Sequence, residues 1–96
     1  MIKHIVCYKL KDNSADIISK VKDTLLSLKG RVPQVIDLNV GEDMMHSSRS
    51  YDVALEVVLN SRQDLIDYAN DTYHCQVVKA YIHSVVEVSV TVDYEF

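Results

Sequence analysis

The stretch YDVALEVVL, residues 51–59, decides the fold because apolar side chains recur in it at every second position. Alternation with a period of two is typical of a β-strand that buries one face. The apolar face holds Tyr51, Val53, Leu55, Val57 and Leu59, and the mixed face holds Asp52, Ala54, Glu56 and Val58. We therefore expect other strands beside this one and a helical layer over its apolar face.

The chain before this strand predicts a strand, a helix and a further strand. Residues 2–10, IKHIVCYKL, alternate in the same way. Asn13 can cap a helix with Asp16 three residues later, and Gly30 after Lys29 is a typical helix end. The apolar positions at helical spacing are Ile17, Val21, Leu25 and Leu28. After Pro33, residues 35–40 predict the next strand, with Ile36, Leu38 and Val40 on one face and Gly41 at its end.

The chain after residues 51–59 predicts two short helices and a last strand. Ser61 and Asp64 resemble a capping box for a helix that ends near Ala69. Polar residues 70–72 interrupt it, and a second helix follows with His74 in its first turn. Residues 85–94 are rich in β-branched side chains and predict the final strand, whereas residues 42–50 lack a period and predict a loop with a solvated His46.

The resulting order is strand, helix, strand, strand, helix pair, strand. In one sheet with right-handed crossovers, this order gives a ferredoxin-like βαββαβ arrangement, an α+β fold with an antiparallel four-stranded sheet and helices on one face. The length of 96 residues suits a single domain over residues 1–96.

In the expected arrangement, the sheet face away from the helices carries both polar and apolar side chains. It holds Lys3, Ile5, Cys7, Lys9, Asp52, Ala54, Glu56, Val58, Val85, Glu87, Ser89 and Thr91. One interpretation is a solvated face with a few exposed aliphatic side chains. The other is a face covered by a second copy, in which Lys3 and Lys9 meet Glu56 and Glu87 of a homodimer.

Composition excludes several classes of protein. The net charge is −4 and the ten Lys and Arg residues are dispersed, so we expect no nucleic-acid partner. No apolar run approaches the roughly 18 residues of a membrane span, and the chain starts as a strand without a secretory signal, so we expect no membrane partner and a cytoplasmic location. Two cysteines are too few for a disulfide framework. The four histidines lack metal-site spacing, and no phosphate-binding glycine motif occurs, so neither a metal nor another cofactor is expected.

Three polar aromatic side chains form the candidate site: His4, Tyr68 and His74. His4 shares a strand face with Val6 and needs a partner if it is buried there. His74 lies in the first turn of a helix, where the positive end of the helix dipole favours a neutral imidazole that can act as a base. Each residue also has an ordinary structural interpretation, as a satisfied core histidine, a large core tyrosine and a helix-entry histidine.

The helix break at residues 70–72 affects the choice between a shared site and ordinary structural roles for Tyr68 and His74. On one continuous helix Tyr68 and His74 would lie about 240° apart and could not face the same cavity. Interrupting the helix allows both side chains to point inward, although an ordinary turn between two helices would leave the same pattern.

Four stretches together resemble the stress-responsive dimeric A/B barrel (Dabb) domain family. They are IKHIVCYKLKD at 2–12, VPQVIDLNVGED at 32–43, SYDVALEVVLNSRQDLIDYAND at 50–71 and YHCQVVKAYIHSVVEVSVTVDYEF at 73–96. The resemblance implies a homodimer in which two sheets form an α+β barrel with the helices outside. It implies no single activity.

One plant type within this family is a polyketide cyclase that makes olivetolic acid. Its strand-one His, helix-end Tyr and helix-opening His fall here on His4, Tyr68 and His74. A tyrosine of its first helix falls near Leu25, and relatives often carry His-Pro where this chain has Asp71 and Thr72.

Two function classes follow from these observations. The first is a stress-type dimer without an assigned reaction that has a pocket for a small apolar or aromatic ligand. The second is a cofactor-independent cyclase or lyase in which His74 is the base, Tyr68 donates to an enolate oxygen and His4 orients the substrate. In both classes the expected apolar walls are Val6, Leu25, Leu55, Val77 and Val88.

Overall fold

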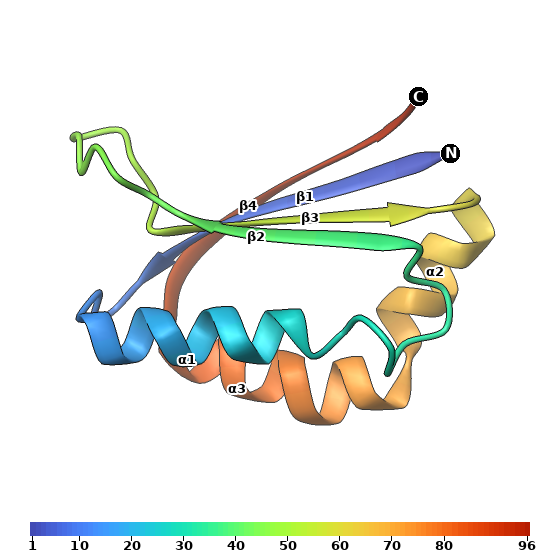
Figure 1. Ribbon diagram of the computed structural model, residues 1–96, viewed down its shortest axis with the longest axis horizontal. Coiled ribbons are helices and arrows are strands. Elements are labelled where there is room, and N and C mark those ends of the chain that lie inside the picture. Colours follow the sequence, from blue (N-terminus) through green and yellow to red (C-terminus); the bar gives the residue numbers. More distant parts are fainter.

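A computed structural model describes residues 1–96 and has the expected ferredoxin-like fold (Figure 1). The elements are β1 (Ile2–Leu10), α1 (Ala15–Leu26), β2 (Asp37–Glu42), β3 (Val53–Leu59), α2 (Arg62–Asn70), the π-helix η1 (His74–Lys79), α3 (Ala80–Val85) and β4 (Val86–Glu95). The strands pair in the order β2-β3-β1-β4, and every pair is antiparallel. In Figure 1 all helices lie on one side of the sheet, and the other side is bare. No helix has the length and apolarity needed to cross a bilayer.

The core lies between the sheet and the helices. Its 17 buried residues are apolar or tyrosine, and no charged side chain is buried among them. Val21 and Leu25 of α1 are almost completely buried, as are Leu55 and Val57 of β3. Because α1 presents its apolar residues at helical spacing and β3 presents its own at every second position, the two faces meet as one hydrophobic layer.

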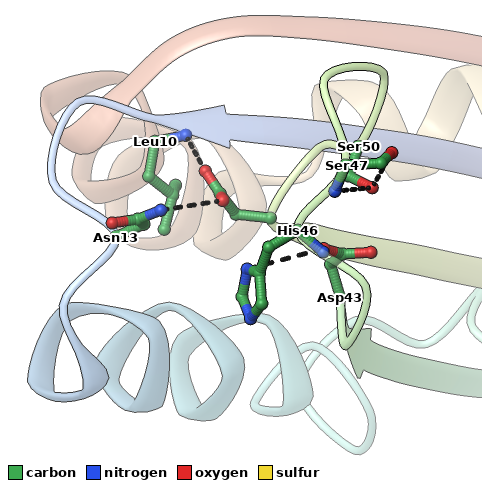
Figure 2. A network of polar contacts seen from close by, with 7 residues as sticks. Leu10, Asn13, Asp43, His46, Ser47 and Ser50 are labelled. Atoms are coloured by element: carbon green, nitrogen blue, oxygen red, sulfur yellow. Dashed lines mark hydrogen bonds and ion pairs between the residues drawn. The ribbon is translucent and has the colours of Figure 1, made fainter.

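The starts of the two longer helices differ in how well the sequence predicts them. The Ser61 hydroxyl accepts a hydrogen bond from the Asp64 N–H at 3.1 Å, as expected for the cap of α2. The expected cap of α1 by Asn13 is wrong, because α1 begins after Ser14. The Asn13 amide instead donates to the Asp52 carboxylate at 3.4 Å, and the same carboxylate accepts from the Leu10 N–H at 2.8 Å (Figure 2).

The loop between β2 and β3 satisfies its own polar groups. Asp43 accepts a hydrogen bond from the His46 N–H at 2.7 Å, and the Ser47 N–H donates to the Ser50 hydroxyl at 3.1 Å (Figure 2). His46 has a left-handed φ of 50°, and its side chain is largely exposed. The loop histidine is thus part of a turn rather than of a cavity.

Strand β2 starts two residues later than expected. It spans Asp37–Glu42, with Gly41 inside the strand opposite Ala54, whereas the sequence predicts residues 35–40 with Gly41 as the end. Leu38 is buried, but Ile36 precedes the strand and is exposed. Glycine is normally depleted in strands, which explains the misplaced boundary.

Strand β4 has its two faces exchanged relative to the expectation. Ser89 and Thr91 pair with Tyr8 and Val6, so they lie on the helix-covered face, because directly paired residues share a face. Val88, Val90 and Val92 pair with residues of the open face, namely Lys9, Cys7 and Ile5. A bulge where Leu10 pairs with Val86 and Lys9 with Val88 leaves Glu87 as an extra residue.

The corrected orientation makes the open sheet face more apolar than the sequence suggests. Val88, Val90, Val92 and Tyr94 are all exposed there. Lys3, Lys9 and Glu56 lie on the same face at paired positions, whereas Glu87 falls at the bulge. The serine and threonine assigned to this face belong to the other one.

Candidate functional site

A cavity of about 240 Å³ lies between the sheet and the helices. His4 from β1, Tyr68 from α2 and His74 from η1 all line it. Most of the remaining lining is hydrophobic, which gives polar groups at the wall of an otherwise apolar chamber. Small-molecule sites in proteins have this composition, although the volume is below the 300 to 1,000 Å³ that is common for drug-sized ligands.

The three aromatic rings are in contact. The ring of Tyr68 stacks on that of His74, with centroids 4.4 Å apart and an interplanar angle of 28°. Tyr68 also meets His4 edge-on, with centroids 5.6 Å apart and an angle of 63°. Tyr68 therefore contacts both imidazoles.

The polar atoms of these rings differ in whether they have a partner. His4 Nδ1 is hydrogen-bonded to the Asp93 carboxylate of β4. The Tyr68 hydroxyl and His74 Nδ1 are buried and have no hydrogen-bond partner in the protein. Burying a polar atom without a partner costs about 1 to 3 kcal/mol, so such atoms are uncommon in folded proteins.

Burial shifts both of these groups toward their neutral forms. It lowers the pKa of His74 below its ordinary value. The Ala69 carbonyl, which lies near the imidazole without meeting hydrogen-bond geometry, acts in the opposite direction, whereas Lys79 adds to the lowering. Burial is also the main cause that raises the pKa of Tyr68, with smaller contributions from Tyr8 and Asp93. At neutral pH the site thus contains a neutral imidazole with a free nitrogen and a neutral phenol.

The chain between the two helices places His74 beside Tyr68. Asp71 ends α2 with an extended ψ of 136° and accepts a hydrogen bond from the His74 N–H at 3.1 Å. Helical residues resume at Thr72, and His74 begins a π-helical turn rather than the α-helical start expected from the sequence. π-Helical turns inside helices often occur at functional sites because they displace side chains from regular α-helical positions.

The apolar walls match the expectation at three positions and differ at two. Val6, Leu25 and Leu55 line the cavity. Val77 and Val88 lie outside it and are 48% and 42% exposed, which corrects the expectation for both. Val78, only 1% exposed, takes the place of Val77 in the lining. Val88 faces the open side of the sheet because the two faces of β4 are exchanged relative to the expectation.

Sequence reasoning also misses several polar residues of the site. Ser89, Thr91, Lys79, His83 and Tyr8 line the cavity. Asp93 is the partner of His4. The alternation of β4 contains the necessary signal, because Ser89, Thr91 and Asp93 share one strand face, but the apolar Val88, Val90 and Val92 are the more obvious candidates for a core.

The remaining reactive side chains do not form a second cluster. Both cysteines are free and partly buried. The Cys75 thiol donates to the Ala69 carbonyl at 3.2 Å. No three His, Cys, Asp or Glu side chains are grouped so that they could hold a metal ion.

The βαββαβ sheet, its one-sided helical layer and the cavity between them define a ferredoxin-like α+β protein. The model of the stress responsive A/B barrel domain family matches residues 2–96, and the chain belongs to this family. Comparison with curated proteins gave no match.

Solved structures from bacteria and plants have the same fold. A dimeric protein of unknown function from Bacteroides fragilis is 24% identical, with a TM-score of 0.83 over 99% of this chain and 95% of that one. A protein from Arabidopsis thaliana is 16% identical, with a TM-score of 0.87 over 100% and 95% of the two chains. A hydroxynitrile lyase from Passiflora edulis is 18% identical, with a TM-score of 0.82 over 97% and 90%.

Proposed function

We propose that the protein is a homodimer that binds a small molecule with an apolar or aromatic body in the cavity between sheet and helices. The observation that carries this proposal is the pair of unpartnered buried atoms, the Tyr68 hydroxyl and His74 Nδ1. Both belong to residues that line the same apolar cavity. A ligand carbonyl or hydroxyl placed between them would supply the missing hydrogen bonds, which offsets the cost of their burial.

The homodimer is supported by the open face of the sheet. Val88, Val90, Val92 and Tyr94 form an exposed apolar stripe along β4, and exposed apolar stripes of this kind often mark protein interfaces. A second copy would cover it by packing sheet against sheet. Solved relatives from Bacteroides fragilis and Thermobifida fusca are described as dimeric, which agrees with this proposal.

The binding proposal can be tested by nuclear magnetic resonance with a neutral probe of suitable size, 4-phenylbutanamide. We expect shift changes that saturate with concentration and cluster at lining residues such as Leu25, Leu55 and Val78. The exposed Ile66 of α2 is outside the cavity lining and is the internal reference. Shift changes scattered over the surface, or none at millimolar probe, would contradict the proposal.

A second candidate function is proton transfer at a carbon next to a carbonyl. It is favoured by the specific combination of a neutral imidazole and a neutral phenol in ring contact. In this reaction His74 Nδ1 takes the proton, the C–H electron pair moves into the enolate, and the Tyr68 hydroxyl donates to the enolate oxygen. Asp93 holds His4, which orients the bound carbonyl. Cyclisation or lyase chemistry would start from such an enolate.

This reaction can be measured without knowledge of the natural substrate. The probe is 4-phenylbutan-2-one in D₂O, whose α-hydrogens exchange for deuterium only when a base removes them. We expect catalysed exchange that falls by about 10² to 10⁴ in His74→Ala, the usual contribution of a general base. Exchange at an equal rate in the variant would exclude His74 as the base and leave ligand binding as the function.

A further inference from the structure

The rim of the cavity carries cationic and hydroxyl groups that the candidate site does not use. Lys79 ends η1 and His83 lies four residues later in α3, which continues the same helix, so the two side chains lie on the same side of it. Ser89 and Thr91 come from the helix-covered face of β4. All four line the cavity, and Lys79 and His83 are exposed to solvent.

The positive charge of Lys79 is not neutralised inside the protein. The ion pairs of the structure use other cations, and no carboxylate lies within ion-pair distance of the Lys79 ammonium group. The positive charge of Lys79 acts electrostatically on the site, because it contributes to the lowered pKa of His74. An exposed lysine beside an apolar chamber can both guide and hold an anion.

No carboxylate lines the cavity. Two carboxylates that contact residues of the site are already engaged: Asp93 binds His4, and Asp71 binds the His74 N–H. The charged group on the lining is thus a cation, although the whole chain has a net charge of −4. The charge on the cavity lining is therefore positive, whereas the net charge of the protein is negative.

We propose that the ligand is a monoanion, a small carboxylic acid with an apolar or aromatic body. Its carboxylate lies at the rim on Lys79, with His83, Ser89 and Thr91 as hydrogen-bond donors, and its body extends inward toward Tyr68 and His74. A single lysine without an arginine suits one negative charge better than a phosphate, which usually recruits several donors or a glycine-rich loop. This inference rests on the proposed ligand-binding function and specifies its substrate class.

The experiment compares two probes of nearly equal shape, 4-phenylbutanoate and 4-phenylbutanamide, by titration calorimetry at low salt. We expect the carboxylate to bind roughly three- to tenfold more tightly than the amide, as one partly exposed ion pair allows. Lys79→Gln should reduce this preference to less than about twofold. Added salt should weaken the binding of 4-phenylbutanoate but not that of 4-phenylbutanamide.

Lys29→Gln is the matched control, because it removes the same charge from an exposed lysine that pairs with Asp37 at 3.2 Å outside the cavity. It should keep the full preference for the carboxylate. Equal binding of both probes to the wild-type protein, or an unchanged preference in Lys79→Gln, would overturn the anion inference and leave the ligand cavity in place. Binding of neither probe would overturn the proposed function as well.

Discussion

Tyr68 and His74 stack with ring centroids 4.4 Å apart, although His74 is six positions after Tyr68 in the chain. At about 100° per residue, a continuous helix would rotate the second side chain by a net angle of about 240°, so the two would point about 120° apart. The extended backbone at Asp71 ends one helix, and the next resumes at Thr72 and becomes π-helical at His74. The interruption therefore brings two side chains from different helices into one cavity wall.

Tyr68→Phe should separate binding from stability. The Tyr68 hydroxyl has no partner in the free protein, so its removal breaks no hydrogen bond. We expect the free energy of unfolding to rise or to change by less than about 0.5 kcal/mol. Binding of 4-phenylbutanamide should weaken about two- to tenfold, the net value of one hydrogen bond. Thermal melts and calorimetric titrations on the same preparations measure both quantities.

Tyr81→Phe is the matched control for this substitution. The Tyr81 hydroxyl is also buried without a partner, but Tyr81 does not line the cavity. Its removal should have a similarly small effect on stability and none on binding. Equal loss of affinity in both variants would show that the Tyr68 hydroxyl has no direct part in binding.

The stability of the protein should depend on pH through His74. Its pKa is lower in the folded protein than the ordinary value of 6.5, mainly because of burial. As the pH falls below about 6.5, the unfolded chain takes up a proton that the folded chain resists, so the free energy of unfolding decreases. His74 therefore contributes its full share of stability above that pH and loses it progressively as the pH falls toward the folded pKa.

Urea unfolding between pH 5 and pH 7.5 measures this effect in the wild-type protein and in His74→Gln. The difference in slope between the two isolates His74 from the other histidines. We expect the variant to lose less stability on acidification. A steeper or identical loss in the variant would contradict the inferred burial of a neutral imidazole.

The sequence predicts the fold well because its apolar periods change clearly between strands and helices. Leu55 and Val57 at alternate spacing and Val21 and Leu25 at helical spacing leave little choice about which faces meet. The orientation of β4 is harder, because alternation shows which residues share a face but not which face the helices cover. The valines of β4 look like core residues, and in the monomer they face away from the core.

The residues at the centre of the candidate site can be predicted from the sequence, but several of their neighbours cannot. His4, Tyr68 and His74 are identifiable because polar aromatic residues occupy positions where the pattern calls for apolar ones. The exchange of Val77 for Val78 has a local cause, since the π-helical turn His74–Lys79 departs from α-helical spacing. The pairing of His4 with Asp93 depends on the register between β1 and β4, which no local pattern contains.

Val90→Asp should convert the proposed dimer into a monomer. Val90 is 48% exposed near the middle of the edge strand β4, on the open sheet face and paired with Cys7. An aspartate enclosed there without a partner costs several kcal/mol, roughly 3 to 5, which raises the dimer dissociation constant by more than about a hundredfold. Light scattering should give a mass of about twice 10.9 kDa for the wild-type protein and a single 10.9 kDa chain for the variant.

The control for this prediction is Val77→Asp. Val77 is equally exposed, at 48%, but lies on the helical side of the molecule. This variant should keep the mass of the wild-type protein. A wild-type monomer at micromolar concentration, or a dimer that survives Val90→Asp, would show that the valine stripe is not the interface.

Asp71→Ala should weaken ligand binding through the position of His74. The Asp71 carboxylate accepts the hydrogen bond from the His74 N–H at 3.1 Å and so fixes the first turn of the helix that carries the imidazole. Loss of such a cap costs about 0.5 to 2 kcal/mol of stability. Because the turn loosens where His74 stacks on Tyr68, affinity for 4-phenylbutanamide should fall as well, whereas Asp71→Asn keeps a side-chain oxygen and should restore most of it.

Ser61→Ala is the matched control, because Ser61 caps α2 in the same manner, with its hydroxyl accepting from the Asp64 N–H at 3.1 Å. Its loss should cost a similar amount of stability, but Ser61 does not line the cavity, so affinity should stay within about twofold of the wild-type value. Melting temperatures and calorimetric titrations on the two alanine variants show whether the Asp71 cap positions His74 or only stabilises the helix. If both variants lose the same stability and both keep their affinity, the Asp71 cap stabilises the helix without positioning His74, and the interruption after Tyr68 is an ordinary connection between helices.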